Sequence, residues 1–231
     1  MGGNTLFYPG CLTKFAAKEL LENYKKILAL EGVDFVTLAD NEVCCGSPLK
    51  NAGAKNTFHD LAKKNLEIFK NHSIDQIISN CPSCVAMFKI DYQEILGKAW
   101  NIEVKHVVEI MDKSLSKLEK VQNKTATYHD PCHLGRVLGI YEKPRKIIKQ
   151  AGFKLLEMDL HGEFSFCCGA GGGVKSNEEE LSNKIATDRI DQAKTVGADV
   201  LITACPMCYA HLKQNKDNLN VMEMSQMFDL E

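Results

Sequence analysis

The stretch IDQIISNCPSC, residues 74–84, joins a short apolar run to a Cys-Pro-x-Cys motif, and ADVLITACPMC, residues 198–208, repeats this arrangement in the second half of the chain. An apolar run that leads directly into a longer amphipathic segment is typical of a buried parallel strand followed by a helix. The proline fits the first helical position, where its missing N–H is not needed. Each stretch therefore predicts a strand-to-helix junction with two thiols at the helix N-terminus.

Outward from these junctions, short apolar runs alternate with amphipathic segments in both halves, which is the pattern of parallel βαβ units. We predict an α/β fold of two tandem halves related by a pseudo-twofold axis, each a small Rossmann-like domain with a parallel sheet. The polar stretch 113–124 separates the halves, so we expect domains at 1–118 and 119–231. The predicted strands are 5–8, 34–38, 74–79, 104–107, 125–128, 154–158, 200–203 and 220–222.

The ten cysteines form two copies of one pattern, with no thiol left over. In each copy, the first cysteine and the Cys-x-x-Cys pair follow predicted strands, and a vicinal pair lies in a loop between them. Because the carboxyl ends of parallel strands meet at one edge of a sheet, five thiols of each half are expected to converge there. The copies are Cys11, Cys44, Cys45, Cys81 and Cys84, and then Cys132, Cys167, Cys168, Cys205 and Cys208.

Charge and hydropathy exclude several classes of function. The net charge is −2 over 231 residues, with both signs interspersed, so there is no basic stripe for nucleic acid. Residues 1–11 lack the charge and apolar run of a signal peptide, and no apolar run of about 18 residues follows. We expect a cytoplasmic protein with no nucleic-acid partner and no direct membrane insertion. Cytoplasmic thiols are kept reduced, which favours metal binding or catalysis over a disulfide framework.

Three kinds of thiol site compete for this pattern. A structural zinc site combines two nearby pairs into four ligands, whereas each copy here has five thiols and a single Cys-x-x-Cys pair. A dithiol oxidoreductase accounts for the Cys-Pro-x-Cys motif but leaves three thiols of each copy unused. An iron–sulfur cluster, held by such a pair together with distant cysteines, explains more of the pattern.

The fifth thiol of each copy indicates either a cluster that is not a simple cubane or a cysteine reserved for substrate. We assign the catalytic role to Cys45 and Cys168, the second members of the vicinal pairs. Gly46 and Gly169 directly follow these pairs and are candidate cofactor-binding residues.

Four polar side chains in the second half are further candidates. His129 and His133 flank Cys132, where a histidine serves either to supply a proton and tune the cluster or to cap the strand-to-helix turn by hydrogen bonding. Arg136 and Arg145 are expected either to meet an anionic substrate or partner, or to lie on a solvated helix face.

The whole pattern resembles that of the cysteine-rich CCG-domain proteins, whose signature is a cysteine, a later Cys-Cys-Gly and then a Cys-x-x-Cys. The resemblance covers nearly the whole chain and extends to YPGC at 8–11, HDPCH at 129–133 and CCGAGGG at 167–173. Within this family the chain is similar to heterodisulfide reductase catalytic subunits. That resemblance implies a noncubane [4Fe–4S] cluster on each five-cysteine set. It also implies that the two clusters face one another across the substrate and reduce a disulfide in two one-electron steps.

The chain lacks the closely packed Cx2Cx2Cx3C run of ferredoxin clusters. We therefore expect electrons from a separate partner, either a ferredoxin-like iron–sulfur subunit or a flavoprotein. Two other functions remain open. One is a non-catalytic electron-transfer subunit of a flavin dehydrogenase for lactate, glycolate or glycerol-3-phosphate. The other is a zinc-stabilised interaction module, which metal analysis separates from the redox functions.

Overall fold

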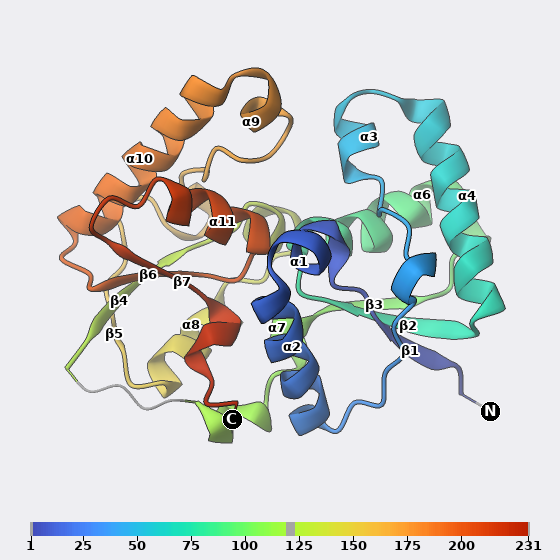
Figure 1. The fold of residues 1–231 in the computed structure, drawn as a ribbon, viewed down its shortest axis with the longest axis horizontal. Helices are drawn as coiled ribbons and strands as arrows, with labels where there is room; N and C mark the ends of the chain where they lie inside the picture. Colours follow the sequence, from blue (N-terminus) through green and yellow to red (C-terminus); the bar gives the residue numbers. More distant parts are fainter. Residues whose placement is uncertain (1, 119–122, 231) are drawn as a thin grey trace.

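The computed structural model describes residues 2–118 and 123–230 and folds as two α/β halves that lie side by side (Figure 1). The first half comprises β1 (Asn4–Phe7), α1 (Gly10–Ala16), α2 (Lys18–Glu31), η1 (Ala39–Asn41), α3 (Ser47–Asn51), α4 (Lys55–Asn71), β2 (Ile74–Ser79), α5 (Pro82–Ala86), η2 (Met87–Asp91), α6 (Tyr92–Leu96), η3 (Gly97–Ala99), β3 (Glu103–His106), α7 (Val107–Ile110) and η4 (Ser114–Lys117). The second comprises β4 (Thr125–His129), η5 (His133–Val137), α8 (Glu142–Gln150), β5 (Lys154–Leu155), η6 (Gly162–Phe164), α9 (Val174–Asn177), α10 (Glu179–Thr195), β6 (Val200–Thr203), α11 (Pro206–Gln214), β7 (Asn220–Glu223) and η7 (Met224–Met227).

The strands form two parallel sheets, with the orders β1-β2-β3 and β5-β4-β6-β7. This confirms the α/β class, and the inner strands match the predicted ranges to within one residue. The strand predicted at 34–38 is wrong, because only Val36 pairs, in a single bridge to Leu6. The strand predicted at 154–158 shortens to Lys154–Leu155. Both segments lie at sheet edges, where a neighbour on one side only supports a short strand.

The bridge at Val36 gives the two sheets the same order of segments. Leu6 pairs with Ile77 of β2 on one side and with Val36 on the other, so the 36 segment lies outside β1. In both halves, the order along the sheet is therefore the second, first, third and fourth extended segment of that half. Such a sheet leaves a crevice at the carboxyl ends of its first and third strands, here β1 and β2 in one half and β4 and β6 in the other.

The two Cys-Pro-x-Cys junctions form as the sequence predicts. Helix α5 begins at Pro82 with Cys81 as its N-cap, and α11 begins at Pro206 with Cys205 as its N-cap. The missing proline N–H is tolerated because the first turn of a helix has no backbone acceptor for it. Both motifs are thus held at helix N-termini, directly after central strands.

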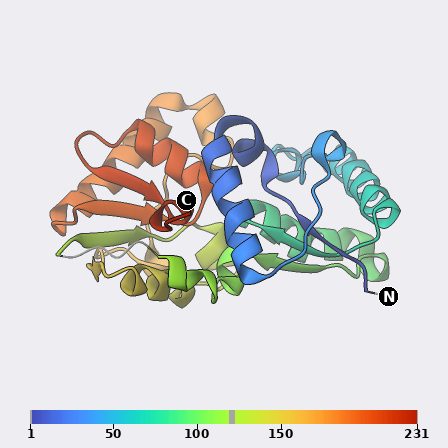
Figure 2. The ribbon, with the colours of Figure 1, turned by 60° about the horizontal axis from the view of Figure 1, so that its bottom comes forward.

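Helix α2 lies between the two sheets and packs on both halves (Figure 2). Its buried apolar side chains, from Leu20 to Leu28, recur at spacings of three and four and form one apolar face, which ends at the buried Glu31. Tyr24 of this helix donates a hydrogen bond of 2.6 Å to the buried Glu223 carboxylate at the end of β7. A single core cluster joins the halves and includes Phe7, Tyr24, Ile27, Leu28, Ile78, Val107, Tyr128, Ile202 and Met224.

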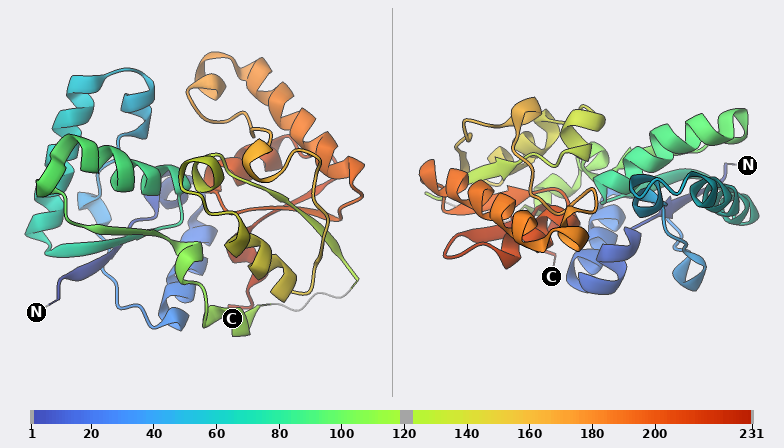
Figure 3. Two further views of the ribbon diagram at one scale, coloured as in Figure 1. Left: turned by 180° about the vertical axis from the view of Figure 1, so that it is seen from behind. Right: turned by 90° about the horizontal axis from the view of Figure 1, so that it is seen from above.

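Views from behind and from above show the same side-by-side arrangement (Figure 3). The predicted boundary between 118 and 119 borders residues 119–122, which lie outside the described residues. On the described side, Leu118 forms an antiparallel bridge with Phe228, so the end of the first half pairs with the C-terminal segment. No helix within 2–118 or 123–230 is long and apolar enough to cross a membrane.

Candidate functional site

The five thiols of the first half come together at the carboxyl ends of β1 and β2. Cys11 lies in α1, directly after β1. Cys81 and Cys84 lie at the start of α5, and the vicinal pair lies in the loop between η1 and α3. Hydrogen-bonding contacts link the side chains in the order Cys11, Cys44, Cys45, Cys84 and Cys81.

The second half repeats this set of contacts on the corresponding elements. Cys132 follows β4, the Cys-x-x-Cys pair begins α11 after β6, and the vicinal pair lies between η6 and α9. The side chains contact one another in the order Cys132, Cys167, Cys168, Cys208 and Cys205. The structure thus brings together all ten predicted thiols, in two sets of five.

Burial differs systematically within each set. All ten cysteines are free thiols, and Cys11 is the exposed one. Cys45 and Cys168, the third thiols in their contact orders, are only 5% and 4% exposed. The first site therefore opens toward Cys11, the second is half-open at Cys132 and Cys167, and both are closed behind the second member of the vicinal pair.

Backbone N–H groups support sulfur at both sites. Gly46 N–H points at Cys44 Sγ over 3.4 Å, and Gly169 N–H points at Cys167 Sγ over 3.3 Å. Such donors stabilise a thiolate, because hydrogen bonds to the charged form favour it. The two candidate cofactor-binding glycines thus act through their backbone on the first sulfur of each vicinal pair.

The thiols of a set strongly perturb one another's ionisation. Hydrogen bonds from neighbouring thiols, Cys11 first, hold the pKa of Cys44 well below its usual range, and Cys132 has the same effect on the pKa of Cys167. Conversely, the hydrogen bond to Cys44 and burial raise the pKa of Cys11. Five thiolates side by side repel one another unless a cation compensates them, and coordination to a metal deprotonates thiols outright.

The donor set therefore suits a polynuclear iron–sulfur group better than a single metal ion. One zinc ion takes four ligands in a tetrahedron, whereas each set offers five contiguous thiols. Cluster iron is held by thiolates, and burial together with hydrogen bonds to sulfur tunes such a site. The ten cysteines would hold the group, five in each half.

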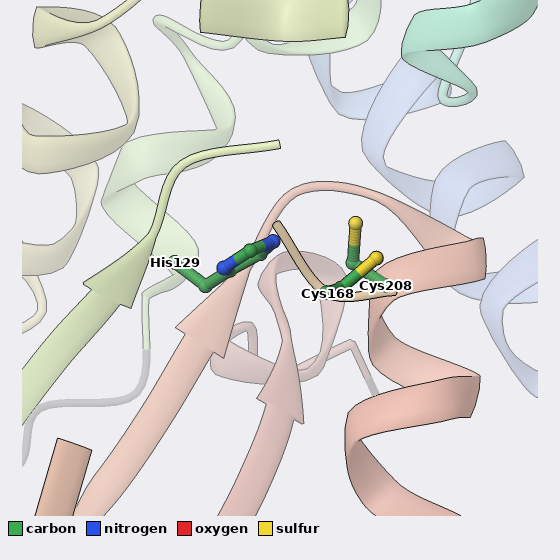
Figure 4. Close-up of side chains that lie close together, drawn as sticks. All are labelled: His129, Cys168 and Cys208. Atoms are coloured by element: carbon green, nitrogen blue, oxygen red, sulfur yellow. The ribbon is translucent and has the colours of Figure 1, made fainter. Parts of the chain in front are cut away.

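A histidine faces the second set (Figure 4). One ring nitrogen of His129 and the sulfurs of Cys168 and Cys208 all lie within 4.8 Å of one another. Arg189 Nε donates a hydrogen bond of 3.1 Å to Nδ1 of the ring. His129 Nε2 is buried and has no hydrogen-bond partner among the described residues. Of the two roles expected for His129, this position favours action on the sulfurs of the second site over capping of the strand-to-helix turn.

The two thiol sites border the same interface between the halves. Helix α5, which carries the Cys-x-x-Cys pair of the first set, packs against η5, which follows Cys132 of the second. Reciprocally, α1, which carries Cys11, packs against α11, which carries Cys208. His133 of η5 lies 3.4 Å from Cys132 Sγ through its Nδ1. Burial lowers the pKa of His133, and so does Lys50 of the opposite half.

Both expected roles of Arg145 are wrong. Its guanidinium is buried and bonds bidentately to the Asp130 carboxylate, at 2.7 and 2.9 Å, and also to Glu157. Asp130 further accepts the Gly162 N–H at 2.9 Å, so this ion pair fastens the loop after β4. Arg136 donates to the Ser165 carbonyl at 2.7 Å.

Arg189 is a site residue that the sequence pattern did not indicate. It is fully buried in α10, between Ala186 and Ala193 on the helix face that packs against the sheet. A charged residue within an apolar stripe was the one available signal, since such a residue needs buried partners.

The fold and the site define a duplicated, cysteine-rich α/β protein with one five-thiol site in each half. The model of the CCG cysteine-rich domain matches the chain twice, at residues 5–89 and 126–213. The chain therefore belongs to the CCG cysteine-rich domain family, and the predicted resemblance is confirmed.

Individual relatives agree with this assignment. The chain is 37% identical to a subunit of the dihydromethanophenazine:CoB–CoM heterodisulfide reductase of Methanosarcina acetivorans, over 94% of this chain and 55% of that one. It is 34% identical to the EtfAB:quinone oxidoreductase of Syntrophomonas wolfei, over 97% of this chain and 33% of the other. The chain thus spans about half, or less, of these relatives. A solved hypothetical protein of Helicobacter pylori shares the fold, with a TM-score of 0.63 at 12% identity, over 97% of this chain and 48% of that one.

Proposed function

We propose that this chain is an iron–sulfur oxidoreductase subunit that reduces a disulfide at two paired noncubane [4Fe–4S] clusters. The observation that carries the proposal is the pair of five-thiol sets with one contact order, placed on elements that pack against each other. The similarity to a heterodisulfide reductase subunit over 94% of the chain supports it.

The proposed ligands are the ten cysteines, five for each cluster. Cys45 and Cys168 occupy the middle of the contact orders and touch a thiol on either side. We assign them the catalytic position, because a fifth thiol between two others is what a four-ligand cubane does not use. Gly46 and Gly169 complete the site by directing backbone N–H groups at the neighbouring sulfurs.

The proposed reaction takes up two electrons and two protons, breaks the S–S bond and releases two thiols. When bound, each cluster supplies one electron, so a pair of clusters delivers the two that the bond requires. The chain's own part is to place both thiol sets at one interface, through the contacts of α5 with η5 and of α1 with α11. Holding both sulfurs of the substrate between the two thiol sets makes the cleavage an effectively unimolecular reaction.

The architecture belongs to the same proposal. We take the halves, 1–118 and 119–231, as two Rossmann-like domains related by a pseudo-twofold axis. The equal order of extended segments and the reciprocal contacts across the interface support this description. The strand ends add a further parallel, since His106, the last residue of β3, and Glu223, the last residue of β7, both cap the following turn with a capping box.

The electron donor in this proposal is a separate ferredoxin-like iron–sulfur subunit or a flavoprotein. The similarity to the EtfAB:quinone oxidoreductase favours one alternative in particular, a non-catalytic relay that passes electrons from a flavin dehydrogenase to an acceptor. Both functions use the same clusters, so they differ only in whether the chain itself cleaves a disulfide.

The test is anaerobic reconstitution, followed by metal analysis and a disulfide reduction assay. We expect about eight iron atoms per chain, matched by acid-labile sulfide. Serine at Cys81 should remove only the first cluster, and serine at Cys205 only the second. With a one-electron donor, the doubly loaded chain should reduce a hetero-disulfide, and either variant should lose this activity. Zinc without iron contradicts both redox functions. If both clusters are intact and none of a range of disulfides is reduced, the disulfide reductase function is contradicted and the electron relay is supported.

A further inference from the structure

The second half contains a buried cation without a carboxylate partner. Arg189 is 0% exposed, and no carboxylate within the described ranges forms an ion pair with it. Its nitrogens donate to neutral acceptors, namely the Leu160 carbonyl at 2.8 Å, Gln192 Oε1 at 2.6 Å, Ser165 Oγ at 3.1 Å and the ring of His129. Asp130 and Glu157 act on Arg189 only through space, because both carboxylates bond to Arg145. A buried charge needs an opposite charge close by, and the sulfurs of Cys208 and Cys168 are the nearby anionic candidates that have no cation of their own among the residues that the structure describes.

The contact with Arg189 fixes the protonation of His129. A guanidinium N–H can only donate, so Nδ1 of the ring must accept and carries no proton. The neutral ring then bears its one proton on Nε2. That nitrogen is an N–H donor rather than a metal ligand, because its lone pair is not available.

The donor is directed at sulfur. Nε2 is buried without a hydrogen-bond partner in the described part of the chain, and the ring points toward Cys168 and Cys208 (Figure 4). An unpartnered buried N–H is rare in folded proteins. A thiolate, or a cluster sulfur beside these two cysteines, supplies the missing acceptor.

The first half has no such device at the corresponding positions. Tyr8 precedes Cys11 by three residues, as His129 precedes Cys132, and its hydroxyl donates to the Val43 carbonyl at 2.7 Å. Asn65 is the eleventh residue of the 17-residue helix α4, as Arg189 is of the 17-residue helix α10. The Asn65 amide donates to the Cys44 carbonyl at 2.9 Å and to Tyr92. Both side chains are neutral, and both donate their hydrogen bonds to oxygen atoms rather than to sulfur.

We propose that Arg189 and His129 make the two clusters electronically unequal, by raising the reduction potential of the second-half cluster above that of the first. The inference rests on the proposed function. Hydrogen bonds to sulfur and local charge set the potential of an iron–sulfur cluster, and both are added on one side only. The second cluster then accepts the first electron and fixes the direction of transfer between the sites. Arg189 is a positioning residue, since it acts through the ring of His129 and through its charge.

The experiment is an EPR-monitored redox titration of the iron-loaded chain with one cluster removed at a time. The Cys81→Ser protein, which keeps the second cluster, should be reduced at a higher potential than the Cys205→Ser protein, which keeps the first. We expect at least a tenfold difference in the ratio of reduced to oxidised cluster at a fixed potential, about 59 mV for a one-electron couple. Equal potentials would overturn the inference.

Variants of the second site then identify the residues responsible. In the Cys81→Ser background, His129→Tyr introduces the residue of the first half, and Arg189→Gln removes the buried charge. Each should lower the potential of the remaining cluster by a tenfold ratio or more, whereas Arg189→Lys should retain part of the shift. Lys184→Gln removes a charge from an exposed position of α10 and should leave the potential unchanged.

Arg189 is fully buried, so its replacement is liable to prevent folding. A second measurement therefore tests the inference with Arg189 unaltered. With ¹⁵N-labelled histidine, and with His133→Gln to remove the other ring beside Cys132, the second cluster of the Cys81→Ser protein should show a ¹⁵N coupling in electron–nuclear double resonance. The cluster of the Cys205→Ser protein should show none. Lack of the ¹⁵N coupling at the second cluster would contradict the inference while iron binding stands, whereas failure to bind iron would contradict the proposed function itself.

Discussion

At the scale of single residues, the glycine after each vicinal pair sets the path of the backbone beside the sulfur. Gly169 has a φ of 84°, and a Cβ built on it would lie 2.6 Å from the Ser182 carbonyl oxygen. Gly139 has a similar φ of 72° with nothing within 4 Å. We predict that Gly139→Ala costs only the conformational strain, about 1 kcal/mol of unfolding free energy, and that Gly169→Ala costs roughly 3 kcal/mol, because backbone must also move. Urea denaturation measures both, and equal losses would rule out the steric contribution.

The same scale separates what sequence reasoning could and could not predict. The spacing of the cysteines was sufficient to predict their convergence, because thiols after parallel strands must meet at one sheet edge. The burial of Arg145 and Arg189 could not be predicted from the spacing of residues. Their burial depends on partners such as Asp130 and Ser165, which lie 15 and 24 residues away and reach them only through the tertiary fold. Spacing indicates which residues share an element, whereas burial depends on what packs against it.

At the scale of elements, the Asp130–Arg145 pair joins the end of β4 to α8. The two side chains are 2% and 6% exposed, while Glu157, the second partner, is 30% exposed. We predict that Asp130→Asn lowers the unfolding free energy by about 3–5 kcal/mol, because it leaves a buried guanidinium without its main counter-charge. Glu157→Gln should cost about 1 kcal/mol or less, since water screens that carboxylate. Thermal or urea denaturation of the two variants decides this, and a larger loss for Glu157→Gln would refute the assignment.

The edges of the sheets mark where prediction of elements failed. The central strands are buried by neighbours on both sides, so their apolar runs were unambiguous. At 34–38, by contrast, pairing ends after Val36, and the chain enters η1 with Ala39 at a φ of 46°. A turn of this kind depends on the local path of the loop toward Cys44, which the alternation of apolar residues does not record.

At the scale of the whole molecule, the halves are similar in sequence but not independent in packing. Helix α2 belongs to the first half, yet its Tyr24, Ile27 and Leu28 enter a core cluster with Tyr128 and Met224 of the second. Removing either half would expose this cluster to water, at a cost of roughly 25 cal/mol for each Å² of apolar surface. The duplication visible in the sequence therefore produced two sites whose halves share a core cluster.

This shared core leads to the last prediction, that the chain unfolds in one cooperative step. Trp100 is the single tryptophan and lies buried among first-half residues, so its fluorescence reports that half, while circular dichroism reports the whole chain. The two signals should change at the same urea concentration, as a two-state transition requires. Leu28→Ala, at a fully buried position of α2, should lower both midpoints together, with a loss of about 2–5 kcal/mol from the cavity it creates. If the fluorescence midpoint fell without the circular dichroism midpoint, the halves would be separate folding units, and the interface that brings the two thiol sets together would be a docking surface between domains rather than a common core.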